Sequence, residues 1–229
     1  MSPPAQKLTL YTYFRSSASA RVRTVMALHG IPREDIYIHL LKGDQSSDSY
    51  KEVNPSGTVP TLVIHREQGE LVLSQCIAIM EYLDEVYGPA SATGRLLPAD
   101  AEARATVRSI VDLVVGDLFP MLTMGILNRV KSHGVDGPTW AKECCASILP
   151  ALEGLLARTS ATGRYAYGDA VTMADAALVP QIYTVLRFYP DISAFPTVKS
   201  VFDHCAALPA FVAADWRHQP DTPEEFRAK

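Results

Sequence analysis

The sequence predicts two domains of different class: a mixed α/β domain of order βαβ–ββα, then a domain that is helical throughout. Apolar runs typical of strands occur only in the first third of the chain. Residues 89–98, PASATGRLLP, hold two prolines and a glycine, and the strand pattern stops there. From Asp100 onward, apolar residues recur at helical spacing. We therefore expect an α/β domain at 1–88, a linker at 89–98 and an all-α domain at 99–229.

The stretch from Lys7 to Ile31 predicts a buried strand followed by a helix. Its first part is almost fully apolar and contains neither Pro nor Gly, as a buried strand does. The helix can be capped by Ser16, Ser17 or Ser19, and Gly30 supplies a stop. Hydroxyls and free backbone N–H groups therefore meet at the helix start, and this arrangement favours an anion.

Three arginines, Arg15, Arg21 and Arg23, crowd the start of this helix. A cation at the N-terminal end of a helix is disfavoured by roughly 0.3 to 1 kcal/mol. One interpretation is that a negatively charged ligand binds there. The other is that the arginines pair with carboxylates elsewhere in the fold.

The α/β domain continues with a strand, a short helix, a hairpin and a second long helix. Asp35–Leu40 alternates apolar and polar residues, which predicts a half-buried strand. Val59-Pro60 leads into the hairpin, and a cis bond there would turn the Val59 backbone outward for pairing. Ser74 is expected to cap the last helix. The other expected ranges are 47–53 for the short helix, 62–65 and 71–73 for the hairpin strands, and 77–86 for the last helix.

The second domain is expected to contain only helices. Thr172 and Asp175 have the spacing of a capping box before an apolar run, which indicates a folding signal more than a catalytic pair. The expected helical ranges are 100–133, broken at Gly116 and Pro120, then 138–158, 172–188, 197–207 and a short piece from Pro209.

Composition excludes several classes of function. The formal net charge is −4 with no basic run, which argues against nucleic-acid binding. No apolar run approaches the length of a membrane span, and the first residues lack the apolar core of a signal peptide, so we expect a cytoplasmic protein with no membrane partner. The four cysteines have no metal-ligand spacing, which predicts reduced thiols and no metal site.

Several sequence blocks, in order and at family spacing, resemble the zeta-class glutathione transferases and maleylacetoacetate isomerases. YFRSSASARVR is similar to the class signature SSCxWRVR, NPSGTVPTL to NPxxxVPTL, and LSQCIAIMEYL to LxQSxAIIEYL. VTMADAALVPQ and HQPDTPEE extend the resemblance, which covers residues 7 to 227. It implies the cytosolic glutathione transferase architecture, with a thioredoxin-like first domain and glutathione as cofactor.

The resemblance also implies the residues of a glutathione site. Ser16 and Ser17 match the two signature serines, one of which is expected to hydrogen-bond the glutathione sulfur and favour its thiolate. A helix N-terminus with hydroxyl donors lowers a thiol pKa from its free value of about 8.5. Further glutathione contacts are expected at Gln45, Val59, Pro60, Gln75 and Cys76.

Several residues at the expected glutathione and acceptor sites depart from the family. Cys76 stands in place of a serine that helps to hold the γ-glutamyl carboxylate, and a thiol is the weaker donor. Ala18 replaces the family cysteine and Ala20 its tryptophan, which is expected to open space above the sulfur. Thr184 replaces an asparagine.

The acceptor site is expected to be apolar. Phe119, Leu122 and Thr123 stand where the isomerases carry a glutamine and a Gln-Asn pair, whereas Arg187 matches an arginine placed near the substrate carboxylate. An apolar pocket favours flat hydrophobic ligands and disfavours buried unpaired charge.

These features favour a glutathione-dependent cis-trans isomerase or conjugating transferase acting on a hydrophobic unsaturated carbonyl compound in specialised metabolism. The thiolate adds to the electron-poor double bond, and elimination after rotation gives the trans isomer, whereas no elimination gives a conjugate. Three alternatives stay open: a glutathione-independent isomerase or cyclase on the same scaffold, a non-catalytic ligand carrier, and a true maleylacetoacetate isomerase. The resemblance further implies a homodimer.

Overall fold

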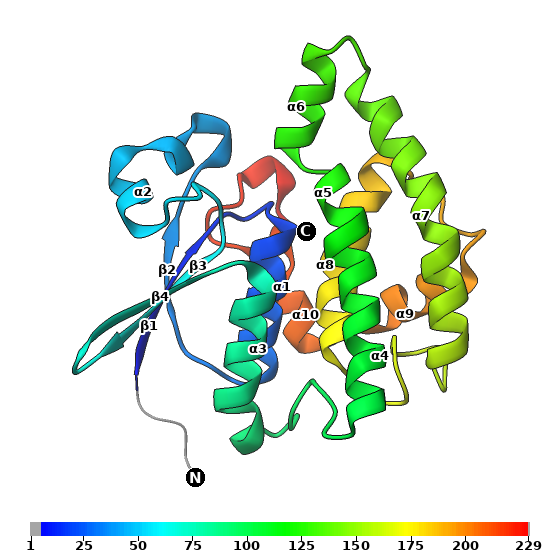
Figure 1. Cartoon of the computed structure of the whole chain (residues 1–229), viewed down its shortest axis with the longest axis horizontal. Helices are drawn as coiled ribbons and strands as arrows, with labels where there is room; N and C mark the ends of the chain where they lie inside the picture. Colours follow the sequence, from blue (N-terminus) through cyan, green and yellow to red (C-terminus); the bar gives the residue numbers. More distant parts are fainter. Residues whose placement is uncertain (1–5, 229) are drawn as a thin grey trace. The chain divides into compact units, whose positions relative to one another are not determined.

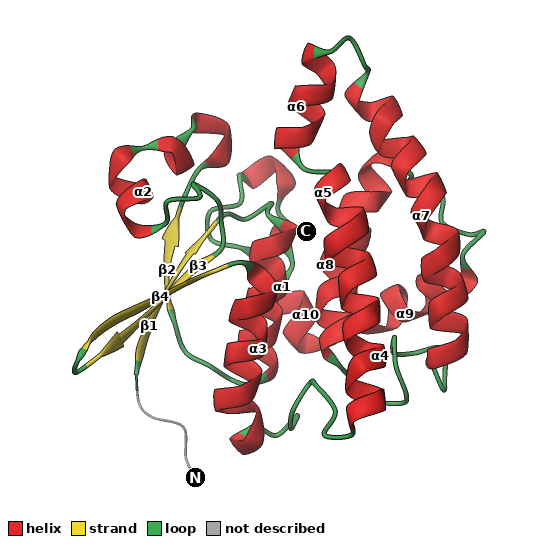
Figure 2. Cartoon of the chain, in the orientation of Figure 1, coloured by secondary structure: helices red, strands yellow, loops and turns green. Residues whose placement is uncertain are grey.

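The computed structural model describes residues 6–228, and these form two compact units. The first unit takes in the described residues up to Arg95 together with those from Pro209 onward. The second unit is Leu96–Leu208. All the labelled strands belong to the first unit, and the second is drawn as helices and loops (Figures 1 and 2). The predicted fold class, an α/β domain and an all-α domain, is confirmed.

The first unit is built on a four-stranded sheet of order β2-β1-β3-β4. β1 and β2 are parallel, whereas β3 is antiparallel to both β1 and β4. The inner strands β1 and β3 are the most buried, as their continuous apolar runs predict. The strands are β1 (Lys7–Thr12), β2 (Glu34–Tyr37), β3 (Thr61–Arg66) and β4 (Gly69–Ser74).

The second strand is shorter and more exposed than its alternation predicts. It ends at Tyr37, and Ile36, expected on the buried face, is 36% exposed. β2 lies at the edge of the sheet, where one side of the strand has no neighbour. Ile38, just beyond the strand, is buried as expected.

The helices of the first unit are α1 (Ser17–Leu28), α2 (Asp48–Val53), α3 (Cys76–Tyr87) and α10 (Pro209–Ala214), and α1 packs against both α3 and α10. The sequence places residues from Pro209 in the helical domain, but their contacts are with α1. The expected capping of α3 by Ser74 is wrong. The N-cap residue is Gln75, which makes no side-chain cap, because β4 continues through Ser74.

The second unit contains the helices expected from the sequence: α4 (Ala101–Asp112), α5 (Phe119–Met121), α6 (Met124–Ser132), α7 (Gly137–Thr159), α8 (Met173–Phe188) and α9 (Pro196–Ala206). The predicted capping box of Thr172 and Asp175 is present at the start of α8. α8 is its most buried helix and packs against α4, α7 and α9.

The predicted break at Gly116 is a change of helix type. Residues Leu113–Leu118 form a π-helix between α4 and α5, with Phe119 N bonded to Val114 O. In an ordinary α-helix the ring of Pro120 would clash with the carbonyl of Gly116. A wider turn relieves that clash, so the chain stays helical as far as Met121.

Within 6–228 no single helix has the length and hydropathy of a membrane span, although the bent pair Ala101–Met121 and Met124–Ser132 together passes that test. The same residues hold no group of three or more His, Cys, Asp or Glu side chains suited to a metal ion.

Candidate active site

The register of the sheet brings the predicted glutathione residues of the first unit close to one another. They lie where β1, β2 and β4 end and β3 begins, and this side of the sheet is called here the glutathione edge. Tyr11 pairs with Thr61, and Thr61 pairs with Ser74. The end of β1, the start of β3 and the end of β4 are therefore neighbours. Thr12 pairs with Tyr37 of the parallel β2, so the end of β2 lies at the same edge. The segments that carry Ser16, Gln45 and Gln75 leave the sheet there, and the segment that carries Val59 enters it.

Ser16 lies in the serine loop, defined here as residues 13–16, and it is the N-cap residue of α1. Its Oγ accepts a hydrogen bond from Ser19 N at 3.1 Å, and its own N–H donates to Tyr13 O at 3.1 Å. The oxygen is thereby fixed while the O–H proton remains available to a ligand. Ser17 is the first residue of α1, and its hydroxyl has no hydrogen-bond partner among residues 6–228.

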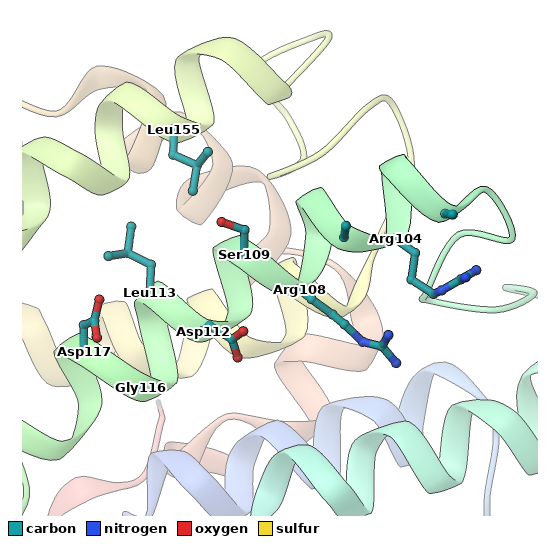
Figure 3. A pocket seen from close by; sticks show the side chains of 10 residues that line it. Arg104, Arg108, Ser109, Asp112, Leu113, Gly116, Asp117 and Leu155 are labelled. Carbon is teal, nitrogen blue, oxygen red and sulfur yellow. The ribbon is translucent and has the colours of Figure 1, made fainter.

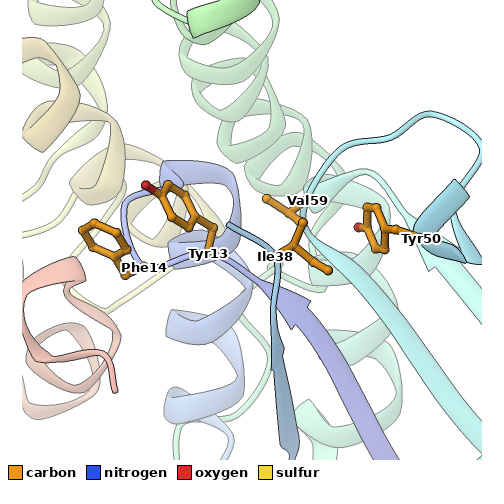
Figure 4. Close-up of a cluster of buried hydrophobic side chains, with 5 residues drawn as sticks. All are labelled: Tyr13, Phe14, Ile38, Tyr50 and Val59. Atoms are coloured by element: carbon orange, nitrogen blue, oxygen red, sulfur yellow. The ribbon is translucent and has the colours of Figure 1, made fainter. Parts of the chain in front are cut away.

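The predicted cis bond between Val59 and Pro60 is present. The preceding carbonyl, Thr58 O, accepts hydrogen bonds from Tyr50 Oη at 2.6 Å and from Asn54 Nδ2 at 2.9 Å. Val59 also belongs to a buried cluster with Tyr13, Phe14, Ile38 and Tyr50 (Figure 4). No backbone hydrogen bond from the described chain reaches Val59, so its N–H and C=O remain available to a peptide-like ligand.

Gln75 and Cys76 form the start of α3. Gln75 has φ 71° and ψ 117°, a conformation rare for residues other than glycine and often found at ligand-binding sites. Cys76 follows as the first residue of the helix and is buried, with its Sγ 3.9 Å from Arg21 Nη1. The unpaired N–H groups of this helix start suit a carboxylate.

Gln45 carries a buried polar atom that the fold does not satisfy. Its Oε1 is buried without a hydrogen-bond partner among residues 6–228. Its backbone is covered by Gly57, since a Cβ at Gly57 would lie 2.9 Å from Gln45 O. Buried polar atoms are normally hydrogen-bonded, so this amide oxygen fits a ligand with an N–H donor.

The three arginines at the start of α1 differ in their surroundings. Arg21 and Arg23 are buried, and burial lowers the pKa of both guanidinium groups, that of Arg23 to about 10. Arg15 is exposed, and its guanidinium lies 5.7 Å and 5.4 Å from the ring centroids of Trp216 and Phe226. The hydrogen bonds of Arg23 go to backbone carbonyls and a hydroxyl, so neither of the two interpretations holds for it.

The residues predicted to line an acceptor site in the second unit have local structural contacts. Leu122 is 5% exposed. Thr123 caps α6, accepting from Ile126 N at 3.5 Å, and donates to Pro120 O at 2.9 Å. Phe119 is half-buried at the start of α5. Their role in substrate binding stays a prediction.

Two further acceptor candidates lie one turn apart on α8. Thr184 Oγ1 points back to Pro180 O at 3.5 Å, and Arg187 is exposed, with its guanidinium 5.2 Å from the ring centroid of Phe188. In the first unit, Ala18 and Ala20 are both buried in α1.

A groove of about 790 Å³ runs along α4 and the π-helix in the second unit (Figure 3). Its lining includes Arg104, Arg108, Asp112 and Asp117 from α4 and the π-helix, and Leu155 from α7. None of the predicted glutathione or acceptor residues lines it.

One group near the serine loop has no place among the predicted site residues. Asp221 Oδ2 accepts a hydrogen bond from Phe14 N at 2.8 Å. The available signal was the block HQPDTPEE, which resembles the family but lies 207 positions along the chain from Phe14. Only folding brings the two together.

The chain matches two family models. Residues 15–86 match the glutathione S-transferase N-terminal domain, and residues 141–209 match the glutathione S-transferase C-terminal domain. The protein also has the mixed four-stranded sheet and the helical second unit of that family. Together, the matches and the fold define a glutathione transferase.

Closer relatives specify the class. Maleylacetoacetate isomerase maiA of Aspergillus fumigatus is 44% identical over 223 residues, which are 96% of this chain and 95% of that protein. The holo structure of a bacterial zeta-class maleyl pyruvate isomerase has a TM-score of 0.85 and 36% identity, over 94% of this chain and 100% of that one. The chain belongs to the zeta-class glutathione transferase and maleylacetoacetate isomerase family.

A third relative shows what such a site holds. The maleylacetoacetate isomerase of Anaeromyxobacter dehalogenans, crystallised with dicarboxyethyl glutathione and citrate in the active site, has a TM-score of 0.84 and 36% identity. The match covers 95% of this chain and 98% of that one, and another structure of the same protein holds glutathione. The predicted enzyme class and glutathione as cofactor are confirmed, whereas the relatives give no support to specialised metabolism.

Proposed function

We propose that the protein is a glutathione-dependent cis-trans isomerase acting on a cis-unsaturated dicarbonyl acid of the maleyl type. The observation that carries the proposal is the meeting of Ser16, Val59 and Gln75 at one edge of the sheet, with polar groups that the fold leaves to a ligand. The relatives named for maleylacetoacetate and maleylpyruvate support the substrate class.

Separate parts of glutathione are recognised by different segments. The N–H groups at the start of α3, from Cys76 onward, suit the γ-glutamyl carboxylate. The backbone of Val59 suits pairing with the peptide, and Gln45 Oε1 accepts from one of its N–H groups. Ser16 is left for the thiol.

The serine loop favours the thiolate over the thiol. Bound glutathione supplies a thiolate that adds to the cis double bond and leaves again after rotation about the resulting single bond. Ser16 donates its O–H to the sulfur, and its orientation is set in advance because its oxygen already caps α1. The partial positive charge at the N-terminus of α1 acts in the same direction. Arg187 is proposed to stabilise the negative charge that develops on the substrate carbonyl.

A second candidate function is isomerisation or conjugation of a hydrophobic unsaturated carbonyl compound. The apolar residues Phe119 and Leu122, at positions where the family carries polar ones, favour it. Identity of 44% along nearly the whole chain favours the maleyl acid. We further propose a cytoplasmic homodimer, whose mass light scattering can measure.

The deciding experiment follows maleylacetoacetate and maleylpyruvate by proton NMR with the purified protein and glutathione. The expected result is conversion to the trans isomers, absent when S-methylglutathione replaces glutathione because no thiol is then available. A panel of hydrophobic cis-enones tests the second candidate. Conversion of the enones alone would overturn the maleyl assignment, and conversion without any thiol would show a glutathione-independent enzyme.

The matched variant is Phe119→Gln, which restores an amide at a position where the family has one. If Phe119 contributes to an acceptor site, kcat/KM for the maleyl acids rises relative to that for the enones. An unchanged ratio would remove Phe119 from the acceptor site.

A further inference from the structure

A buried arginine holds the serine loop from one side. Arg23, in α1, is 1% exposed, and its guanidinium makes five hydrogen bonds. Nη1 donates to Thr12 Oγ1 at 2.9 Å and Tyr13 O at 3.3 Å, and Nη2 to Phe14 O at 3.1 Å. Nε and Nη2 donate to Ala214 O at 3.2 and 3.1 Å. The guanidinium therefore joins the serine loop to the C-terminal segment, defined here as residues 209–228.

A carboxylate of the C-terminal segment holds the same loop through another backbone atom. Asp221 Oδ2 accepts from Phe14 N at 2.8 Å, while Phe14 O accepts from Arg23. Tyr13 O accepts both from Arg23 and from Ser16 N. The Tyr13 carbonyl therefore links the Arg23 guanidinium to the backbone of Ser16.

The C-terminal segment is itself fixed by internal hydrogen bonds. Gln219 Nε2 donates to Ala213 O at 2.9 Å and to Asp215 O at 2.7 Å, on either side of Ala214. The ring of Trp216 lies 6.5 Å, centroid to centroid, from that of Phe14. Thr222 N, next to Asp221, donates to Gln219 O at 3.0 Å. Ala214 O and Asp221 therefore both lie in backbone that is held by Gln219.

Arginine is the only side chain that can make this set of contacts. Its planar fork offers five N–H donors, whereas lysine offers three from one atom. Neither Arg23 nor Asp221 is bonded to Gln45, Val59, Gln75 or Cys76 in the described structure. The hold on the loop is thus separate from the groups proposed to bind the rest of glutathione.

We propose that Arg23 and Asp221 are positioning residues of the glutathione site: they fix the backbone of residues 13–16 and so direct the Ser16 hydroxyl at the thiol. This inference rests on the proposed function. The C-terminal segment then contributes to the glutathione site. Arg23 and Asp221 affect the pKa of the bound thiol, whereas other residues determine the affinity for the rest of glutathione.

The test compares Arg23→Lys and Asp221→Ala with Arg104→Lys in the full-length protein. Arg104 is a matched control, because its guanidinium also donates to backbone carbonyls, those of Pro98 and Ala99, in the second unit. The readouts are the pKa of the bound glutathione thiol from its ultraviolet thiolate absorption, kcat, the Kd for S-methylglutathione from calorimetry, and the Tm.

The expected result is a rise of about one unit in the thiol pKa and a fall in kcat of about tenfold or more for both test variants. The Kd for S-methylglutathione should change by less than about threefold. Arg104→Lys should leave thiol pKa and kcat at wild-type values. A lower Tm with thiol pKa and kcat unchanged in the test variants would overturn the proposal.

Two results separate this proposal from the proposed function. If the wild-type protein binds glutathione but isomerises no maleyl acid, the thiol pKa still tests the positioning role. If the wild-type protein binds no glutathione, both fail together. If Arg23→Lys does not fold, Asp221→Ala decides alone, because Asp221 is half-buried and loses a single hydrogen bond.

Discussion

The glutathione edge of the first unit and the predicted acceptor residues of the second unit use polar groups in opposite ways. At the glutathione edge, the Val59 backbone and Gln45 Oε1 have no partner within the described chain, and Ser16 keeps a proton to donate. In the second unit, Thr123 caps a helix and Leu122 is buried. The difference is that the fold leaves polar groups unpaired at the glutathione edge, whereas the Thr123 hydroxyl is paired within its own helix start.

The largest expected effect concerns the second unit. Asp175 is buried and accepts from Ala166 N at 2.7 Å, Thr172 N at 2.7 Å and Thr172 Oγ1 at 2.9 Å. Asp175→Ala leaves two buried N–H groups unsatisfied and should lower the free energy of unfolding by about 3 kcal/mol or more. Urea denaturation followed by circular dichroism measures this.

The matched control is Asp136→Ala, which removes an exposed N-cap from α7. It should destabilise less than Asp175→Ala, because water replaces the lost partner. Equal losses for the two variants would show that burial of the Asp175 carboxylate does not decide the stability of this unit, and would weaken the comparison.

The next effect concerns the first unit. Ser16→Ala should lower kcat/KM by about 10²- to 10³-fold, because it removes a donor to the developing thiolate. Ser17→Ala should cost less than about tenfold, since its hydroxyl is not held by a capping bond. Steady-state kinetics with saturating glutathione distinguish them. Ser16→Gly is the control for capping, because glycine at an N-cap costs only a few tenths of a kcal/mol. A larger loss for Ser17→Ala would reverse the assignment.

A smaller effect is expected at the start of α3. Cys76→Ser restores a stronger donor beside the proposed γ-glutamyl carboxylate, and should lower the Kd for glutathione by about tenfold, or about 1.4 kcal/mol. Calorimetric titration measures it, with Cys144→Ser in the second unit as control. Unchanged or weaker binding would show that Cys76 acts only as a buried side chain.

The smallest effect is expected for the cysteines of the second unit. Burial raises the pKa of the Cys145 thiol to about 12 and also raises those of Cys144 and Cys205. At pH 8 about one Cys145 in ten thousand is then a thiolate, and the fraction rises with pH toward 12. Ellman's reagent should modify Cys145 only after unfolding. Rapid modification of Cys145 in the native protein at pH 8, located by peptide mass spectrometry, would contradict this.

Local sequence predicted most of the fold because its signals are local. Gly and Pro ended elements near the observed positions, the capping box of Thr172 and Asp175 began α8, and the cis bond at Pro60 is present. The predictions that were wrong concern residues whose structure depends on neighbouring strands of the sheet. Ile36 is exposed because its strand lies at a sheet edge, and Ser74 does not cap α3 because β4 runs through it.

The sequence by itself determined the family, the order of the elements and the residues proposed to bind glutathione, because these depend on motifs a few residues long. Only the tertiary structure decided the surroundings of Arg23 and the place of Asp221. A guanidinium at a helix start predicts an anion site. The hydrogen-bond partners of Arg23 instead include the carbonyl of Ala214, which lies 191 residues further along the chain. Such partners depend on how distant segments pack together, and a sequence pattern of a few residues does not determine that packing.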